Sequence, residues 1–278
     1  MLSVPPGSFP WLEVISPEVR LGHVRHALFD FDGTLSVIRC GWEQVMVPMM
    51  IEMICAGRPP TPEIEAEVAE YVDRSTGILT MEQMRWLEAA VQRHGYAKER
   101  PSATTYKRIY NEQLLKPVRR RIAGMDGSQA ARDSLMLSGA RPFLQGLSDH
   151  GVTLYLASGT DHAYVMEEAG VLGITDYFGS HIHGARDESD ALTKEGIIKR
   201  ILTENNLQGE ALAVIGDGPV EMRAARERGA VALGVAVDEE RRDGPAARKR
   251  QRLLDAGADL IVTSLTHSAE LVALLVGA

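Results

Sequence analysis

The sequence predicts an α/β protein, in which a doubly wound, Rossmann-like parallel sheet forms the core and an all-helical cap domain is inserted into it. Two observations predict this fold class. About 115 residues separate the first strand-like run from the second, whereas a strand–helix–strand unit takes about 30, which indicates an insertion in the first crossover. In addition, five short runs are apolar on both faces, as strands covered by helices on two sides are: residues 26–31, 151–158, 211–218, 230–237 and 258–264.

Helical patterns separate the later strand-like runs. Residues 161–171, 193–206 and 218–229 each place apolar side chains at helical spacing between two such runs. We therefore expect three strand–helix units after residue 150, with their strands parallel.

The inserted segment is helical in pattern throughout. Joints that contain proline or glycine, such as residues 57–62, divide it into four helical stretches: residues 42–57, 61–74, 80–95 and 103–122. We expect a helical cap domain over residues 38–137, and a Rossmann-like catalytic core made of residues 1–37 and 138–278. The first twenty or so residues show no clear pattern.

Composition excludes several classes of function. The chain has 278 residues and a net charge of −8, which argues against nucleic acid or an anionic membrane surface as a partner. No apolar span approaches the roughly 20 residues of a membrane helix, and the N-terminus lacks signal-peptide features, so a cytoplasmic location is expected. Cys40 and Cys55 are expected to be reduced, structural thiols. The mixed-charge run 238–252 is expected to be a solvated loop and helix face.

The first strand-like run ends in a pair of carboxylates, Asp30 and Asp32, followed by Gly33 and Thr34. Strand residues two apart point to the same side, and the carboxyl end of a parallel strand is where ligands bind. Two buried carboxylates this close repel each other unless a cation or a shared proton intervenes, so a metal ion is expected. A plain turn at the end of a strand would use the same residue types, but the full pattern D-x-D-G-T-L is rare by chance.

This pattern resembles the first motif of the haloacid dehalogenase superfamily of phosphotransferases, an Asp-x-Asp-x-Thr after the first strand. The family also places a serine or threonine at the end of its second core strand, and Ser158 followed by Gly159 matches it. A hydroxyl and an accessible backbone N–H at a helix start would bind an anion, although Ser158 could equally cap the helix.

Two further motifs of that family appear in order along the chain. Its third motif is a lysine near a helix start, for which Lys194 is better placed than its competitor Lys199. Its fourth motif is an acidic pair after an apolar strand, matched by Asp217 and Glu221. The family more often has aspartate at the second position, so Glu221 is only a further candidate as a metal ligand.

The resemblance implies a mechanism. Asp30 would be the nucleophile and would form an aspartyl-phosphate, while Asp32 would act as general acid and then as general base. Mg²⁺ would be held by Asp30, the backbone carbonyl of Asp32 and Asp217. Lys194 would bind the substrate phosphate together with Ser158 and Gly159. Halide-displacing and phosphonate-cleaving relatives lack the second aspartate, so phosphate-ester chemistry is favoured.

The expected function is therefore a Mg²⁺-dependent phosphomonoester hydrolase for a small phosphorylated metabolite, such as a sugar phosphate. The alternatives are a phosphoglucomutase-like phosphotransferase and, more remotely, a catalytically silent relative that binds a phosphorylated ligand. The sequence does not indicate an oligomeric state.

Four further features have competing interpretations. Trp42, Glu43 and the break at residues 73–77 are candidate substrate selectors in the cap, or ordinary packing and turn residues. The pair His181 and His183 could share a strand face and bind a metal, but a loop or edge-strand pair is the favoured interpretation, because a third ligand is missing.

Overall fold

A computed structural model describes residues 9–186 and 193–278 and shows a seven-stranded sheet in the order β1-β7-β6-β5-β2-β3-β4. All neighbouring strands are parallel except β1, which runs antiparallel to β7 at one edge. The predicted α/β class with a parallel sheet is confirmed. The strands are β1 (Leu12–Val14), β2 (His26–Phe29), β3 (Thr153–Asp161), β4 (Ile182–Ala185), β5 (Leu212–Gly216), β6 (Val231–Val235) and β7 (Leu260–Val262).

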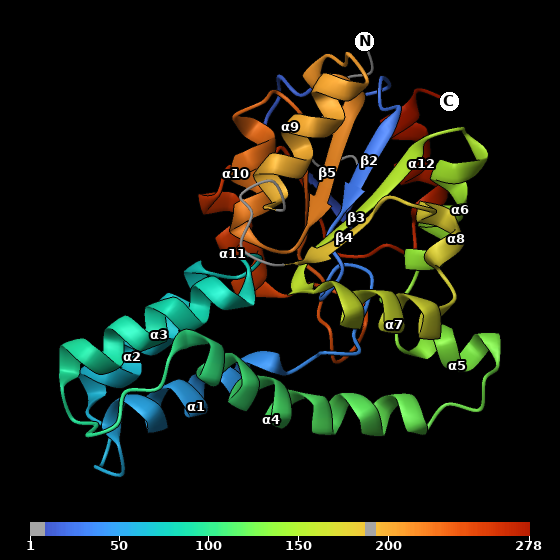
Figure 1. Ribbon diagram of the computed structural model, residues 1–278. Coiled ribbons are helices and arrows are strands. Elements are labelled where there is room, and N and C mark those ends of the chain that lie inside the picture. The colour runs from blue at the N-terminus through green and yellow to red at the C-terminus, as the bar shows by residue number, and fades with distance from the viewer. Residues whose placement is uncertain (1–8, 187–192) are drawn as a thin grey trace.

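Helices cover both faces of this sheet (Figure 1). Successive residues of one strand point to opposite faces, so Phe29 and Ile215 pack into one apolar core while Leu28 and Val214 pack into the other. The core helices are α6 (Ala140–Asp149), α7 (His162–Leu172), α8 (Thr175–Phe178), α9 (Lys194–Glu204), α10 (Pro219–Arg226), α11 (Ala247–Asp255) and α12 (Ser268–Val276), with a 3₁₀ turn at Gly209–Ala211.

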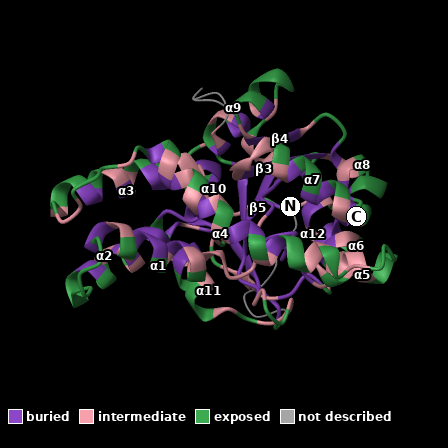
Figure 2. Cartoon of the chain, turned by 60° about the horizontal axis from the view of Figure 1, so that its bottom comes forward, coloured by how far each residue is buried: buried purple, intermediate pink, exposed green. Residues whose placement is uncertain are grey.

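Which helices lie on which face follows from these two cores. The face shared with Phe29 packs against α6, α7 and α12, and the opposite face packs against α9, α10 and α11. Burial on both faces explains why the strand sequences are apolar without alternation. Figure 2 shows this buried centre, with exposed residues on the outer sides of the helices.

A helical unit extends from the carboxyl ends of the strands (Figure 1). Tyr71 and Trp86 stack between two of its helices with ring centroids 3.8 Å apart. Thr61 and Ser102 start helices in this unit, since each side chain accepts a hydrogen bond from the backbone N–H three residues on. The helices are α1 (Trp42–Cys55), α2 (Pro62–Arg74), α3 (Thr80–His94) and α4 (Ala103–Ala123).

The chain enters and leaves this helical unit through two segments that lie side by side. The backbone N–H of Val37 donates to Leu135 O at 2.9 Å, and that of Leu137 donates to Leu35 O at 3.0 Å. The short helix α5 (Gln129–Ser134), within the range expected for the cap, lies beside α7 of the core. The return segment is thus fixed to the core before the chain reaches β3.

Both edge strands lie outside the five apolar runs of the sequence, although an edge strand was one interpretation of the pair His181 and His183. β1 lies in the N-terminal segment that had no assignment, and it adds only three residues to the sheet. β4 forms the other edge and includes His183. Among the residues described, no helix combines the length and apolar character that a membrane crossing requires.

Candidate active site

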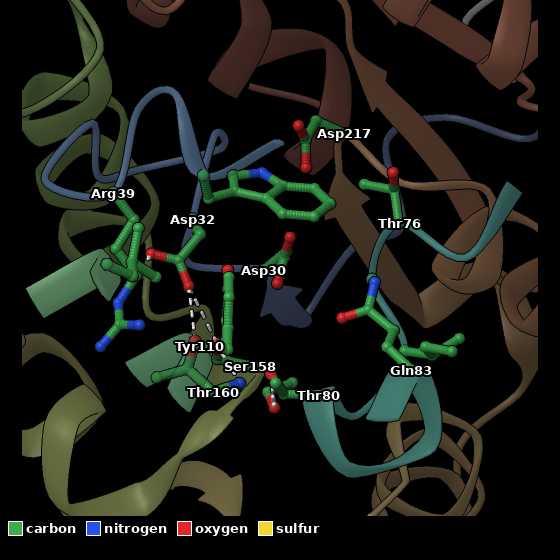
Figure 3. A pocket seen from close by; sticks show the side chains of 15 residues that line it. Asp30, Asp32, Arg39, Thr76, Thr80, Gln83, Tyr110, Ser158, Thr160 and Asp217 are labelled. Atoms are coloured by element: carbon green, nitrogen blue, oxygen red, sulfur yellow. Dashed lines mark hydrogen bonds and ion pairs between the residues drawn. The ribbon is translucent and has the colours of Figure 1, made fainter. Parts of the chain in front are cut away.

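A cavity of about 70 Å³ lies at the carboxyl ends of β2, β3 and β5, beneath the helical unit (Figure 3). Topology places it there, because three parallel strands that are neighbours in the sheet end at the same edge. The core contributes Asp30, Asp32, Ser158, Gly159, Thr160 and Asp217 to its lining. The cap side contributes side chains that include Trp42, Thr76, Thr80, Gln83, Tyr110 and Leu114.

Asp30 directly follows β2 and is held in the sheet by its backbone N–H, which donates to Ile215 O at 2.8 Å. The backbone then turns at Gly33, whose φ is +75°. A Cβ at Gly33 would lie 2.5 Å from Asp217 Oδ2, so only glycine lets the turn approach that carboxylate. The turn thereby brings the first and fourth motifs together.

Lys194 is the first residue of α9 and reaches into the same site. Its Nζ lies 2.7 Å from Asp30 Oδ1 and 3.1 Å from Glu221 Oε1. The side chain is buried, with 6% of its surface exposed. Lys199, the competitor, is exposed on the same helix.

Asp217 follows β5, and Glu221 lies in the first turn of α10, where its Oε1 accepts the backbone N–H of Gly218 at 3.2 Å. One carboxylate oxygen each from Asp30, Asp217 and Glu221 lies within 4.8 Å of the others, so these residues could hold a metal ion. Glu221 Oε2 is buried and has no hydrogen-bond partner among the described residues.

The charges of this cluster do not balance by themselves. Lys194 contacts two carboxylates, and Lys249 contacts two more, those of Asp217 and Glu239, so two ammonium groups face four carboxylates. Burial raises the pKa of Asp30 well above its usual value, Lys194 opposes the rise, and Glu221 adds to it. This local excess of carboxylates over ammonium groups suits a divalent cation.

Asp32 is held differently from Asp30. Its Oδ2 accepts hydrogen bonds from Ser158 Oγ at 3.3 Å and from Thr160 Oγ1 at 3.0 Å, while its Oδ1 has no hydrogen-bond partner among the described residues. Burial raises its pKa, and the opposing influences are first the Arg39 charge and then the two hydroxyl bonds. The two aspartates therefore have distinct surroundings although they are two residues apart.

Ser158 and Gly159 are in the cavity wall, but the expectation that they lie at a helix start is wrong. β3 continues to Asp161, and α7 begins only at His162. The strand pairing is irregular between Ala157 and Asp161, and the backbone N–H of Thr160 donates to Ser158 Oγ at 3.1 Å. The turn that this hydrogen bond closes between Ser158 and Thr160 thus lies within the extended segment that precedes α7.

The cap touches the core at the cavity through the loop between α2 and α3. A Cβ at Gly159 would lie 2.2 Å from Ile78 O, and one at Gly77 would lie 2.5 Å from Glu221 Oε2. Of the proposed selectors, Trp42, Thr76 and Gly77 line the cavity, whereas Glu43 faces a neighbouring pocket.

The run 238–252 contradicts the expectation of a fully solvated loop and helix face. Lys249 Nζ lies 2.7 Å from both Asp217 Oδ2 and Glu239 Oε1 and is 14% exposed. Arg252 is 6% exposed and donates to Asp217 O at 3.2 Å and to Thr76 Oγ1 at 3.0 Å. Apart from Glu239, the partners of Lys249 and Arg252 lie more than 30 residues away, so local charge composition had no signal for these contacts.

Sequence reasoning also missed Arg39. Its Nη2 lies 2.6 Å from Glu168 Oε1 and its Nε lies 3.9 Å from Asp32 Oδ1. The signal for Arg39 in the sequence was its position nine residues after Asp30, in the segment that leads to the cap.

The two histidines do not join the site. His181 stacks on Tyr155 with centroids 4.6 Å apart, and His183 Nε2 lies 3.4 Å from Arg200. Among the residues described, the group of side chains that could hold a metal includes neither histidine.

Comparison with known proteins agrees with the resemblance that the sequence motifs showed. The sequence model of haloacid dehalogenase-like hydrolases matches residues 24–229. No curated protein matches the chain. Among solved structures, the chain is similar to a predicted phosphatase from Clostridium acetobutylicum, with 17% identity, 91% of this chain and 99% of that chain covered, and a TM-score of 0.57.

Two other solved structures are similar to the same extent. A β-phosphoglucomutase from Clostridium difficile is 17% identical, with 87% of this chain and 92% of that chain covered and a TM-score of 0.56. A predicted phosphoglycolate phosphatase from Haemophilus somnus is 13% identical, with 90% and 98% covered and a TM-score of 0.57. These similarities show a shared fold.

Proposed function

Because the chain belongs to the haloacid dehalogenase-like hydrolase family, we propose that it hydrolyses a phosphomonoester of a small metabolite through an aspartyl-phosphate intermediate. One observation carries this proposal. Asp30 is paired with Lys194 at 2.7 Å, whereas Asp32 is bonded to two hydroxyls and keeps one oxygen without a hydrogen-bond partner among the described residues. Two carboxyls in different surroundings suit two roles, attack and proton transfer.

Asp30 would be the nucleophile. Lys194 holds its Oδ1, and its Oδ2 makes no hydrogen bond or ion pair with the described residues. Oδ2 would attack phosphorus as the bond between phosphorus and the leaving oxygen breaks. Lys194 would offset the negative charge that the nucleophile and the phosphoryl group bring together.

Asp32 would move the proton in both half-reactions. It would give its proton to the leaving oxygen in the first step. In the second step, a water would lose a proton to Asp32 and attack the phosphorus of the intermediate, which releases phosphate and restores Asp30. Oδ1, which makes no hydrogen bond with the described residues, suits this role, since Oδ2 already accepts two hydrogen bonds.

Ser158 and Gly159 would bind the oxygens of the phosphoryl group together with Lys194. Both line the cavity beside Asp32, and the Ser158 hydroxyl is free to rotate from Asp32 toward a bound anion.

The residues present fit a magnesium ion. We propose that Asp30, Asp217 and the backbone carbonyl of Asp32 would hold it, with Glu221 as a further ligand through its unpartnered Oε2. The all-oxygen donor set and the local excess of carboxylates over ammonium groups support this choice. When bound, the ion would screen the nucleophile from the anionic substrate and stabilise charge on the transferred group.

Phosphate release from aryl and alkyl phosphates in the presence of Mg²⁺ tests the proposal. Asp30→Asn should lower kcat by about 10⁴-fold or more on every ester, because it removes the nucleophile. Asp32→Asn should harm alkyl phosphates more than p-nitrophenyl phosphate, whose leaving group needs no proton. Full activity of Asp30→Asn, or hydrolysis that persists in EDTA, would contradict the proposal.

The same assay separates hydrolysis from phosphoryl transfer. Isomerisation of a sugar phosphate without phosphate release, and only with a bisphosphate activator, would assign the chain to a mutase reaction. Intact-mass detection of a phosphorylated protein that is absent in Asp30→Asn would support the covalent intermediate in either case.

A further inference from the structure

The cap side of the cavity offers uncharged groups to a substrate. Its aromatic, hydroxyl and amide side chains include those of Trp42, Thr76, Gln83 and Tyr110. Among the described residues that line the cavity, Arg39 alone carries a cationic side chain. Whether the site can accept a second anionic group therefore depends on the charge of Arg39.

The charge of Arg39 is already balanced inside the protein. Its Nε lies 3.1 and 3.0 Å from the two carboxylate oxygens of Glu168, and its Nη2 lies 2.6 Å from Oε1. Arg39 is 5% exposed and Glu168 is 2% exposed, so this pair is largely buried. In Figure 3 the guanidinium lies at the edge of the cavity and points away from Asp30. Asp32 Oδ1, 3.9 Å away, adds a second nearby carboxylate.

Two neutral groups remain available instead. Gln83 Nε2 donates to Ser75 O at 3.4 Å and to Ser75 Oγ at 3.2 Å, which fixes the amide and leaves its Oε1 without a partner among the described residues. The Tyr110 hydroxyl also makes no hydrogen bond within that part of the chain, although the residue is only 4% exposed. Gln83 Oε1 can accept a hydrogen bond, and the Tyr110 hydroxyl can both donate and accept one. Together they match the hydrogen-bonding needs of alcohol groups.

We infer that the substrate is the phosphomonoester of an uncharged, hydroxylated alcohol, and that the cavity rejects a leaving group with a second phosphate or a carboxylate. This inference rests on the proposed phosphomonoester hydrolysis. Lys194 serves the phosphoryl group at Asp30, and among the described residues no side chain with an unbalanced positive charge lines the other end of the cavity. A second anion there would lose its hydration without gaining a counter-ion.

Matched pairs of substrates test the inference with the purified full-length protein and Mg²⁺. Glycerol 2-phosphate and 2-phosphoglycerate differ by one hydroxymethyl group against one carboxylate. We expect kcat/KM to be about 100-fold higher for the neutral member, because the site leaves the extra charge unpaired. Equal or faster release from the charged member overturns the inference while the proposed hydrolysis stands. Absence of phosphate release from every ester, p-nitrophenyl phosphate included, overturns both.

Two variants sharpen the test. Glu168→Gln removes the counter-charge of Arg39 and should shift the preference about tenfold toward the carboxylate-bearing ester. The control Glu167→Gln, one residue away on the surface of α7, should leave the preference unchanged.

Tyr110→Phe conserves the shape of the wall and tests hydroxyl recognition independently of Glu168. It should lower the ratio of kcat/KM for glycerol 2-phosphate to that for ethyl phosphate by about tenfold. An unchanged ratio in this variant contradicts the role of the tyrosine hydroxyl and the inferred recognition of alcohol groups.

Discussion

Gly77 of the cap lies directly against Glu221 of the core, so closely that a Cβ at Gly77 would be 2.5 Å from Glu221 Oε2. The backbone of Gly77 has φ +90°, which also favours glycine. The loop between α2 and α3 can therefore close over the candidate metal ligands only if this position has no side chain.

Gly77→Ala should separate the loop from the site. We expect kcat/KM for a phosphomonoester to fall about 10- to 100-fold, since small misplacements at an active site are costly. Gly57→Ala is the matched control: its φ is +83°, and a Cβ there meets nothing within 4 Å. Both variants should lose about 1 kcal/mol of unfolding free energy to backbone strain. Equal activity in the two variants would refute the role of the contact.

Arg252→Met should loosen the same loop from the core side. Arg252 joins Asp217 O to Thr76 Oγ1, so its loss should speed hydrogen exchange at residues 75–80 and lower kcat/KM about tenfold. Arg252 Nη1 also lies 3.2 Å from Asp73 Oδ1. Arg248→Met is the control, because Arg248 Nε contacts the same oxygen at 3.0 Å from the surface. If Arg252→Met and Arg248→Met change hydrogen exchange at residues 75–80 equally, the ion pairs with Asp73 hold the loop, and the bridge from Arg252 to Asp217 does not.

Lys249→Met should destabilise the fold through the carboxylates that it leaves behind. Asp217 and Glu239 would face each other without a cation, and we expect a loss of about 3 kcal/mol in the free energy of unfolding. The double variant Lys249→Met with Glu239→Gln should recover part of this loss, because one of the two charges is gone. Urea unfolding followed by circular dichroism measures both, and strictly additive effects would argue against the coupling.

His183 predicts a pH dependence of stability. Burial, followed by the charge of Arg200, lowers the pKa of His183 to about 4, whereas an unfolded histidine titrates near 6.5. Between these values the unfolded chain binds more protons, so the protein should lose stability as the pH falls from 6.5 to 4.

His183→Gln should flatten that dependence. The melting temperatures of the variant and the wild type are measured at several pH values, and their difference at each pH is compared with their difference at pH 8. At pH 8 the histidine is neutral in both the folded and the unfolded state, so that difference is the reference. A variant whose profile stays parallel to that of the wild type would show that another group titrates.

The sequence predicted the parts of the site that follow strands in a fixed order. Asp30 and Asp217 stand just after apolar strands, and parallel strands bring such positions to one edge whatever the intervening chain does. Lys194 could be selected over Lys199 because a helix start faces that edge. Asp30 followed from the local pattern, whereas Lys194 and Asp217 were singled out through the resemblance to the family's third and fourth motifs.

The residues that sequence reasoning missed depend on tertiary contacts. Thr160 bonds to Asp32, which lies 128 residues away, and Lys249 meets Asp217 from a helix whose composition looks like a surface. β1 was missed for a similar reason, because only Leu12 of its three residues is buried, so it has no apolar run and forms through its pairing with β7.

The paired segments that lead into and out of the cap have a consequence for folding. β2 must find β3 across the whole insertion, with His26 opposite Thr153, and the entropy of closing so long a loop would slow that step. Once the four cap helices have packed, the hydrogen bonds of Val37 to Leu135 and of Leu137 to Leu35 hold the two ends of that loop together. The packed helical unit can therefore hold the two ends of the loop close together, which shortens the conformational search that pairs β2 with β3.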